Sequence, residues 1–272
     1  MSRWQKIALW LGFLGVAAVA AYLWLAREEP QLAERLVARL PPAVTGKDLR
    51  PPVAAPTLTP QSSPAESSPP GLVDPDLPAL GASDAEAFRA LASLPGGEAA
   101  PALLVQRDLL RRFVTTVDQF TGSKLPLKTR VWAPLAGAFE IDQTDPELRV
   151  GRANAARYQP LVSAFLAIEP TAAVQVYRRW YPLLQAAYAE STGTQRLFQA
   201  RLLEVLEHLC AIRVPEASPA LVLAEGRYRY ADPALEQESV GRKALLRLGA
   251  EEAAKVQQRL GEYRALLVQP PS

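Results

Sequence analysis

The chain of 272 residues contains only one cysteine, Cys210, and one histidine, His208. A single cysteine excludes an intramolecular disulfide and any metal site built on several thiolates, and a single histidine excludes a site built on several imidazoles. Cys210 stands between Leu209 and Ala211, a context typical of a small buried apolar side chain. The sequence therefore predicts that the protein holds no metal ion.

Motifs that bind cofactors or perform familiar catalysis are also missing. The chain has no glycine-rich phosphate loop, dinucleotide fingerprint, serine nucleophile elbow or zinc-binding His-Glu-x-x-His helix. Positive and negative charges are nearly balanced: the chain has 30 Lys and Arg residues and 28 Asp and Glu residues, for a net charge of +2. Such a balance gives no electrostatic footprint for nucleic acid. We expect no cofactor, no nucleic-acid partner and no catalytic residue of a known motif.

One long uncharged apolar run, residues 7–25, dominates the start of the chain. As a helix it would be about 28 Å long, enough to cross the ~30 Å hydrocarbon core of a bilayer. Arg3 and Lys6 precede it, which predicts that residues 1–6 stay in the cytoplasm and that the chain crosses the bacterial inner membrane once. The alternative is a cleaved signal peptide, because the small residues at 18–20 are typical of a cleavage site. The apolar run continues beyond that site, which favours an uncleaved anchor.

Residues 26–76 are rich in proline, alanine and serine. Proline supplies no backbone N–H, and such a composition cannot bury a core. We expect a disordered, semi-stiff spacer between the anchor and a folded domain. A recognition motif for a proline-binding partner is the alternative. A spacer that extends from the inner membrane suits a C-terminal domain in the periplasm.

The remaining residues, 77–268, have the length of one ordinary domain and mainly helical periodicity, and 269–272 form a tail. The expected six or seven helices fall within residues 83–94, 101–120, 148–169, 170–193, 194–212, 233–248 and 250–267. The runs 220–224 and 227–230 predict a small β-hairpin, and 138–141 predicts a further short strand. The expected fold is a single, mainly α, multi-helix domain with a small β-hairpin element.

Local signals mark the ends of several helices. Ser83 and Glu86 have the spacing of a capping box at the start of the first helix. Pro170 suits a first helical position, and Pro182 lies inside the same predicted helix. Gly193 suits the end of that helix.

The best candidate for a polar site is the trio Arg201, Glu204 and His208, on the helix predicted over residues 194–212. Around a helix, His208 lies about 20° and Glu204 about 60° from Arg201, so the three share a stripe. Glu204 could hold His208 as an acid/base pair while Arg201 binds an anion. The alternative, which we favour because no nucleophile is indicated, is an ion-pair network on a half-buried helix face.

Two further polar groups are candidates. Asp118 with Arg111 or Arg112 could form a site, or a salt bridge between helices. Arg157 and Tyr158, with the nearby Arg152 and Asn154, could recognise a carboxylate or phosphate through arginine forks. A solvated helix face is the alternative interpretation of this last cluster.

Six stretches of the domain make an ordered pattern. They are residues 111–118 (RRFVTTVD), 154–160 (NAARYQP), 181–188 (YPLLQAAY), 201–209 (RLLEVLEHL), 228–233 (YRYADP) and 243–247 (KALLR). With this pattern, residues 77–267 resemble the bacterial domain-of-unknown-function 3014 family. The resemblance implies a membrane-anchored protein with a Pro-rich linker, and it implies no activity. Residues 199–200 and 240–242 depart from the family pattern, which weakens any polar site assumed there.

These observations predict an inner-membrane-anchored periplasmic protein with a protein-interaction or scaffold domain, whose partner is another envelope protein. The reasons are the anchor, the long spacer and the poverty of catalytic residues. The alternative is a periplasmic domain that binds a small ligand or the cell wall, with a hydrolase as one form of this alternative.

Overall fold

The computed structural model describes residues 76–135, 139–144, 147–151 and 153–269. The predicted anchor at 7–25, and the predicted linker up to residue 75, lie outside these residues. Among the described residues, no single helix combines the length and the apolar character of a membrane span. The helical segments Ala156–Ala167 and Pro170–Thr192 meet that test only together, across a bend of 81°.

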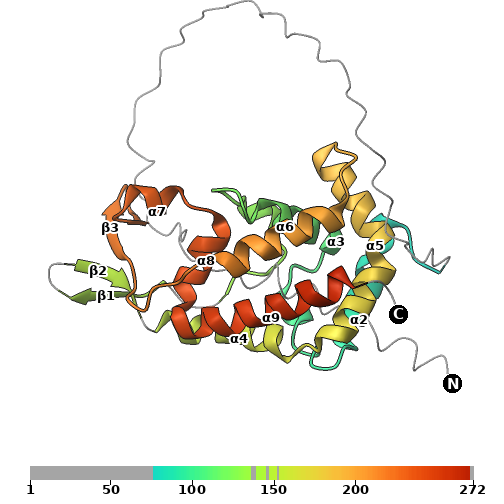
Figure 1. The fold of residues 1–272 in the computed structure, drawn as a ribbon, viewed down its shortest axis with the longest axis horizontal. Coiled ribbons are helices and arrows are strands. Elements are labelled where there is room, and N and C mark those ends of the chain that lie inside the picture. Colours follow the sequence, from blue (N-terminus) through green and yellow to red (C-terminus); the bar gives the residue numbers. More distant parts are fainter. Residues whose placement is uncertain (1–75, 136–138, 145–146, 152, 270–272) are drawn as a thin grey trace, which may run out of the picture. The chain divides into compact units, whose positions relative to one another are not determined.

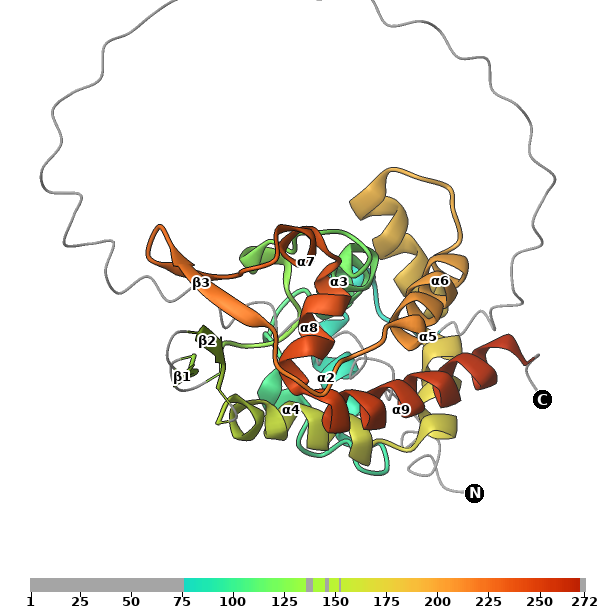
Figure 2. The ribbon, with the colours of Figure 1, turned by 60° about the vertical axis from the view of Figure 1, so that its left-hand side comes forward.

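The described part of the chain contains eight α-helices. They are α2 (Asp84–Ala92), α3 (Leu109–Gln119), α4 (Asn154–Ala167), α5 (Pro170–Thr192), α6 (Phe198–Ala211), α7 (Pro233–Gln237), α8 (Val240–Leu248) and α9 (Ala250–Val268). Helix α9 packs against α4, α5, α6 and α8, and α3 packs against α5 and α6 (Figure 1, Figure 2). The mainly α architecture predicted from the sequence is confirmed for these residues.

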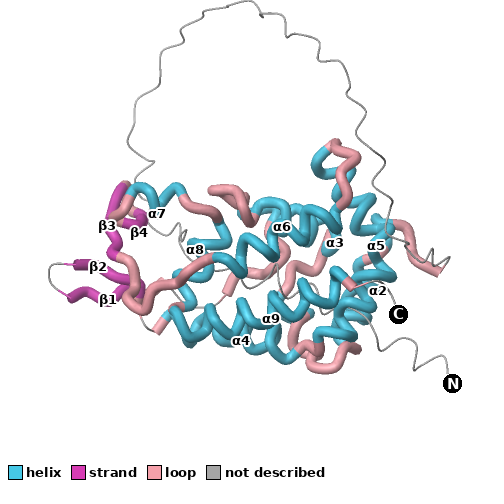
Figure 3. The backbone as a smooth tube through the Cα atoms, viewed as in Figure 1, coloured by secondary structure: helices cyan, strands magenta, loops and turns pink. Residues whose placement is uncertain are grey.

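Four short strands form one antiparallel sheet in the order β1-β2-β3-β4, gathered beside the helices (Figure 3). They are β1 (Ile141–Thr144), β2 (Glu147–Val150), β3 (Ala220–Ala224) and β4 (Arg227–Tyr230). The central pairing, in which Leu148 opposes Leu221, joins two hairpins that are far apart in the sequence. The predicted hairpin at 220–224 and 227–230 is therefore confirmed, as half of a larger sheet. Of the strand predicted at 138–141, residue 141 begins β1 and residue 138 lies outside the described residues.

Among the described residues, the buried apolar side chains form two clusters. The larger cluster is built by the helices and includes the apolar stripe predicted on α6. The buried members of that stripe are Phe198, Leu202, Val205, Leu209 and Ile212. The smaller cluster, centred on Val150, Leu221 and Tyr230, covers one face of the sheet. The helical body and the sheet thus have neighbouring cores.

The capping box predicted at the start of α2 is wrong. The Ser83 hydroxyl donates to the Leu80 carbonyl (2.8 Å) and does not cap α2. Asp84 instead caps a different helix, because its carboxylate accepts from the amides of Asp108 (2.7 Å) and Leu109 (2.8 Å) at the start of α3. Because Asp84 and the start of α3 are far apart in the sequence, no local motif indicates this contact.

The helix predicted over residues 101–120 is shorter in the structure. Its first part, Pro101–Leu103, is a 3₁₀ turn, and Leu104 then forms a β-bridge with Trp132. Helix α3 begins only after Asp108, which has a left-handed backbone with φ of 53°. Pairing with a distant extended segment has overridden the helical periodicity of these residues.

Two further boundaries differ from the prediction. Leu148, where a helix was expected to begin, lies in β2, and α4 begins at Asn154. The helix predicted over 233–248 is two helices, α7 and α8. The break occurs because the Ser239 side chain accepts from the Arg242 amide (3.0 Å) and caps α8.

Candidate functional site

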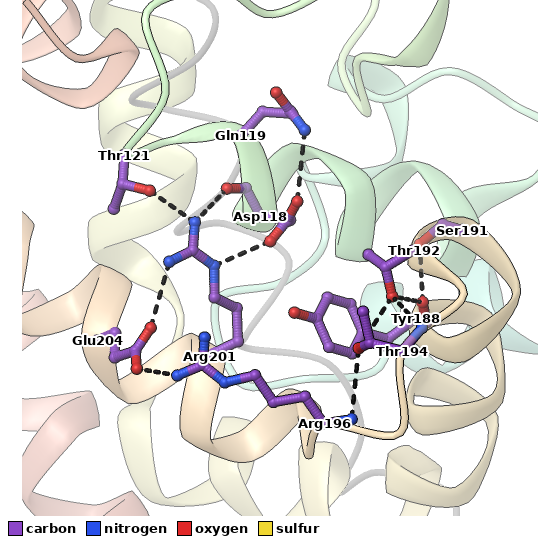
Figure 4. A network of polar contacts seen from close by, with 10 residues as sticks. All are labelled: Asp118, Gln119, Thr121, Tyr188, Ser191, Thr192, Thr194, Arg196, Arg201 and Glu204. Atoms are coloured by element: carbon purple, nitrogen blue, oxygen red, sulfur yellow. Dashed lines mark hydrogen bonds and ion pairs between the residues drawn. The ribbon is translucent and has the colours of Figure 1, made fainter. Parts of the chain in front are cut away.

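Arg201 is the centre of the polar contacts that join α6 to the end of α3 (Figure 4). Its Nε donates to the Asp118 carboxylate (2.8 Å), and its Nη2 donates to the Asp118 carbonyl and to the Thr121 hydroxyl (both 2.6 Å). Its Nη1 donates to the Glu204 carboxylate (3.2 Å). The side chains of Arg201 and Asp118 are 17% and 23% exposed. We call Arg201, Asp118, Thr121 and Glu204 the Arg201 network.

Asp118 thus pairs with Arg201 and not with Arg111 or Arg112. Arg111 forms an ion pair with Glu190 of α5 (3.1 Å). Arg112 donates to backbone carbonyls in the segments before and after α3. Both arginines fasten α3 to its surroundings, and neither joins the Arg201 network.

Glu204 lies between two arginines. It accepts from Arg201 and from Arg196, which precedes α6 (Figure 4). Burial alone would raise the pKa of the Glu204 carboxyl, but the hydrogen bonds from Arg196 and Arg201 outweigh this effect and hold the pKa below its ordinary value of 4.5. At neutral pH, Glu204 is a carboxylate engaged by two guanidinium groups, which makes it unsuited to act as a general acid.

His208, for which the sequence left an acid/base pair with Glu204 as the less favoured alternative, faces Ser239 of the segment before α8. Its Nε2 lies 2.8 Å from the Ser239 hydroxyl. Partial burial lowers the pKa of His208 below its ordinary value of 6.5. Glu238 opposes this shift, and Arg201 and Arg242 add to it. The ring is therefore neutral at pH 7, and its tautomer decides whether Nε2 donates to the Ser239 hydroxyl or accepts from it.

A serine beside a neutral histidine can form an activated nucleophile in hydrolases. Here Ser239 is only 7% exposed, and its oxygen already caps α8. The next two amides could otherwise stabilise an oxyanion, but Val240 donates to the Gly122 carbonyl (2.7 Å) and Gly241 to the Phe120 carbonyl (2.9 Å). Ser239 therefore stabilises the start of α8, and the two amides that follow it are engaged within the fold.

Arg157 and Tyr158 lie on α4 and share no residue with the Arg201 network. Tyr158 is buried, and burial raises the pKa of its hydroxyl, while Arg247 and Arg157 act in the opposite direction. The charge of Arg247 on α8 therefore acts on the Tyr158 hydroxyl of α4. Arg152, which we predicted as a member, lies outside the described residues.

Asn154 has a structural role that its place in the predicted cluster did not indicate. Its Oδ1 accepts from the Glu140 amide (3.1 Å), and its Nδ2 donates to the carbonyls of Gly151 (3.0 Å) and Glu140. It closes the base of the β1–β2 hairpin.

Sequence reasoning missed a cavity of about 450 Å³ between the sheet and α8. Its charged lining residues are Arg149, Asp232 and Arg242. No local sequence spacing relates Asp232, or Arg149 on β2, to Arg242 on the distant α8. The described residues contain no group of three or more His, Cys, Asp or Glu side chains that could hold a metal ion.

No curated protein and no solved structure matches the chain. A family model described as "Protein of unknown function (DUF3014)" matches residues 109–264, which contain α3, the Arg201 network and most of α9. Because this match covers more than half of the 272 residues, the chain belongs to the DUF3014 family of proteins of unknown function.

Proposed function

We propose that this protein is anchored in the bacterial inner membrane by residues 7–25 and that its helical domain, in the periplasm, binds another envelope protein without catalysing a reaction. The observation that carries the proposal concerns the polar side chains that were the best candidates for catalysis. Arg201, Glu204 and His208 are bound to partners within the fold. Side chains bonded in this way stabilise the fold, so we expect a partner protein to bind to other, exposed residues.

The β3–β4 hairpin supplies a surface for this binding. Among the described residues, the exposed large apolar side chains are Leu127, Val222, Leu223 and Val268. Val222 (44% exposed) and Leu223 (60% exposed) are consecutive residues of β3, so they point to opposite faces of the hairpin. Single exposed apolar residues are ordinary, whereas an apolar pair on both faces of one arm suits a partner that encloses it.

The test is capture of partners by the full chain, solubilised gently from membranes, with mass spectrometry of the proteins that stay bound in stoichiometric amount. We expect Val222→Ser combined with Leu223→Ser to lose the partner. Leu127→Ser, at a residue with 43% exposure outside the hairpin, is the matched control and should retain it. A chain that purifies alone, or equal loss in the control, would contradict the proposed binding mode.

The location has a separate test. A reporter that is active only in the periplasm, fused after Ser272, should be active, and the protein should stay in the membrane fraction. Release of the chain as a soluble, shortened protein would support a cleaved signal peptide instead. Activity of a cytoplasmic reporter would reject the proposed orientation.

One observation favours the alternative of a small-ligand domain, namely the cavity lined by Arg149, Asp232 and Arg242. A hydrolase is disfavoured, because the amides beside Ser239 are already bonded to carbonyls. Ligand binding at the cavity is compatible with a scaffold.

A further inference from the structure

The cavity lies where several segments converge. Strand β2, the loop that connects α6 to β3, the turn after β4, and helices α7 and α8 all contribute to its wall. Its volume, about 450 Å³, is within the range of pockets that bind small molecules. The side chains that give it chemical character are Arg149, Pro215, Asp232, Leu235, Arg242 and Leu246.

The two arginines are anchored but accessible. Arg149 donates to the Ser218 carbonyl and pairs with Glu147, and its side chain is 39% exposed. Arg242 forms a long ion pair with Glu238 (3.5 Å), and its side chain is also 39% exposed. These contacts fix the positions of the guanidinium groups, which lowers the entropy that a ligand must remove on binding.

Arg242 has a donor that the fold leaves unused. Within the part of the chain that the structure describes, its Nε–H is buried and has no hydrogen-bond acceptor. A buried donor without an acceptor is unfavourable, and a ligand oxygen could satisfy this one only if the Arg242 side chain shifts to expose it. The planar arginine fork matches the geometry of a carboxylate or a phosphate.

The rest of the wall selects between these anions. Asp232, whose carboxylate caps α7 at the Ala234 amide (2.8 Å), brings a negative charge to the same cavity. It disfavours phosphate, which carries more negative charge than a monocarboxylate. Pro215, Leu235 and Leu246 offer apolar surface to an organic stem. Charge and shape together favour one carboxylate on a short apolar group.

We propose that this cavity binds a monocarboxylate with a short apolar stem, and that Arg149 and Arg242 hold the carboxylate. The site is distinct from the exposed apolar pair of the hairpin. Two sources share this chemistry, a free carboxylic acid and the C-terminus of a peptide. The ligand stem lies against the apolar wall in both cases.

Isothermal titration calorimetry on the full chain in detergent tests the site, with isovalerate as the probe. Isovaleramide is a neutral probe of the same shape, and inorganic phosphate tests for general anion binding. Each probe is also titrated into detergent alone. We expect heat of binding for isovalerate, and binding of isovaleramide and phosphate that is at least tenfold weaker, because a charge-assisted hydrogen bond is worth roughly a tenfold to hundredfold change in affinity.

Two independent variants, Arg149→Gln and Arg242→Gln, should each weaken isovalerate binding by roughly tenfold or more. Arg229→Gln is the matched control, because Arg229 lies on β4, pairs with the exposed Glu225 and does not line the cavity. Circular dichroism verifies that each variant is folded, and either cavity variant alone suffices for the test. No binding of isovalerate at millimolar concentration, or equal binding by the cavity variants and the control, would overturn the proposal.

The peptide Gly-Gly-Leu, with either a free or an amidated C-terminus, separates the two sources. Tighter binding of the free peptide than of isovalerate supports a peptide C-terminus as the natural ligand. Binding of isovalerate without the peptide supports a small free acid. Equal binding of the free and amidated peptides would contradict recognition through the carboxylate.

Discussion

At the scale of single residues, Arg201 shows how one side chain can hold two helices together. It reaches from α6 to a carboxylate, a carbonyl and a hydroxyl at the end of α3. A cation at a helix C-terminus also compensates the partial negative charge of the last carbonyls. Because the guanidinium is mostly buried, these contacts are weakly screened by water.

We predict that Arg201→Gln lowers the free energy of unfolding by about 2–3 kcal/mol, because it leaves Asp118 without its cation in a partly buried place. Arg196→Gln is the control. Its ion pair with Glu204 is 46% exposed on both sides, and its loss should cost less than about 1 kcal/mol. Urea unfolding followed by circular dichroism measures both variants. Equal effects would show that Arg201 has no special structural role.

His208 gives a prediction about pH. Its pKa is lowered in the fold, so the unfolded chain takes up a proton on His208 more readily. The contribution of neutral His208 to stability is therefore complete above pH 6.5 and is lost as the pH falls through the lowered folded value. His208→Gln, which cannot titrate, should lose less unfolding free energy than the parent between pH 7 and pH 5. The comparison is made by urea unfolding at each pH, and parallel curves would contradict it.

The site was only partly predictable from the sequence. Helical periodicity placed Arg201 and Glu204 on one stripe, and the structure confirms that they are bonded. Asp118, which lies 83 residues earlier in the chain, had no local signal that linked it to Arg201. His208 shares the stripe but turns to Ser239, because that partner comes from a different element.

At the scale of elements, the ends of the helices are fastened by side chains from elsewhere in the chain. Arg178 of α5 donates to the carbonyls of Leu266 (3.0 Å) and Gln269 at the end of α9. Arg259 of α9 donates to the carbonyl of Ile168 at the end of α4. The last carbonyls of a helix have no partner within it, so each contact satisfies an acceptor and also joins two helices.

Asp84 fastens the start of a helix in a similar way, and a substitution tests its contribution to stability. Asp84→Ala should lower the free energy of unfolding by about 1–2 kcal/mol, because two amides at the start of α3 lose their acceptor. Glu86→Ala, in the same turn of α2, is the matched control and should change it by less than about 0.5 kcal/mol. Thermal unfolding separates the two. If Glu86→Ala is the more destabilising variant, the result would support the predicted capping box at α2 and contradict the cap observed at α3.

This difference between local and distant partners also explains which elements were predictable. Pro170 and Gly193, whose signals are local, mark the ends of α5 in both the prediction and the structure. Helix α6 was found, but it begins at Phe198 and not at residue 194. Strand β2 was missed because its partners, β1 and β3, decide its conformation.

At the scale of the whole molecule, α3, α6 and α8 meet at one junction. The first amides of α8 donate to the carbonyls of Phe120 and Gly122, just beyond α3, and Arg201 of α6 holds the same end of α3. Free donors at one helix start thus satisfy free acceptors at another helix end. Gly241 makes this approach possible, because a Cβ there would lie 2.3 Å from Leu209 Cδ2 and 3.3 Å from the Phe120 carbonyl oxygen.

We predict that Gly241→Ala lowers the free energy of unfolding by about 1–3 kcal/mol, because the buried Leu209 side chain and the α8 backbone must move apart. Gly261→Ala, inside α9, is the opposite control. A Cβ there meets nothing within 4 Å, and alanine favours a helix, so this variant should gain about 0.5–1 kcal/mol. Urea unfolding gives both values. Changes of opposite sign in the unfolding free energy would show that close packing at the junction, and not helix propensity, requires glycine at residue 241. Changes of equal sign would contradict the tight contact between α8 and α6.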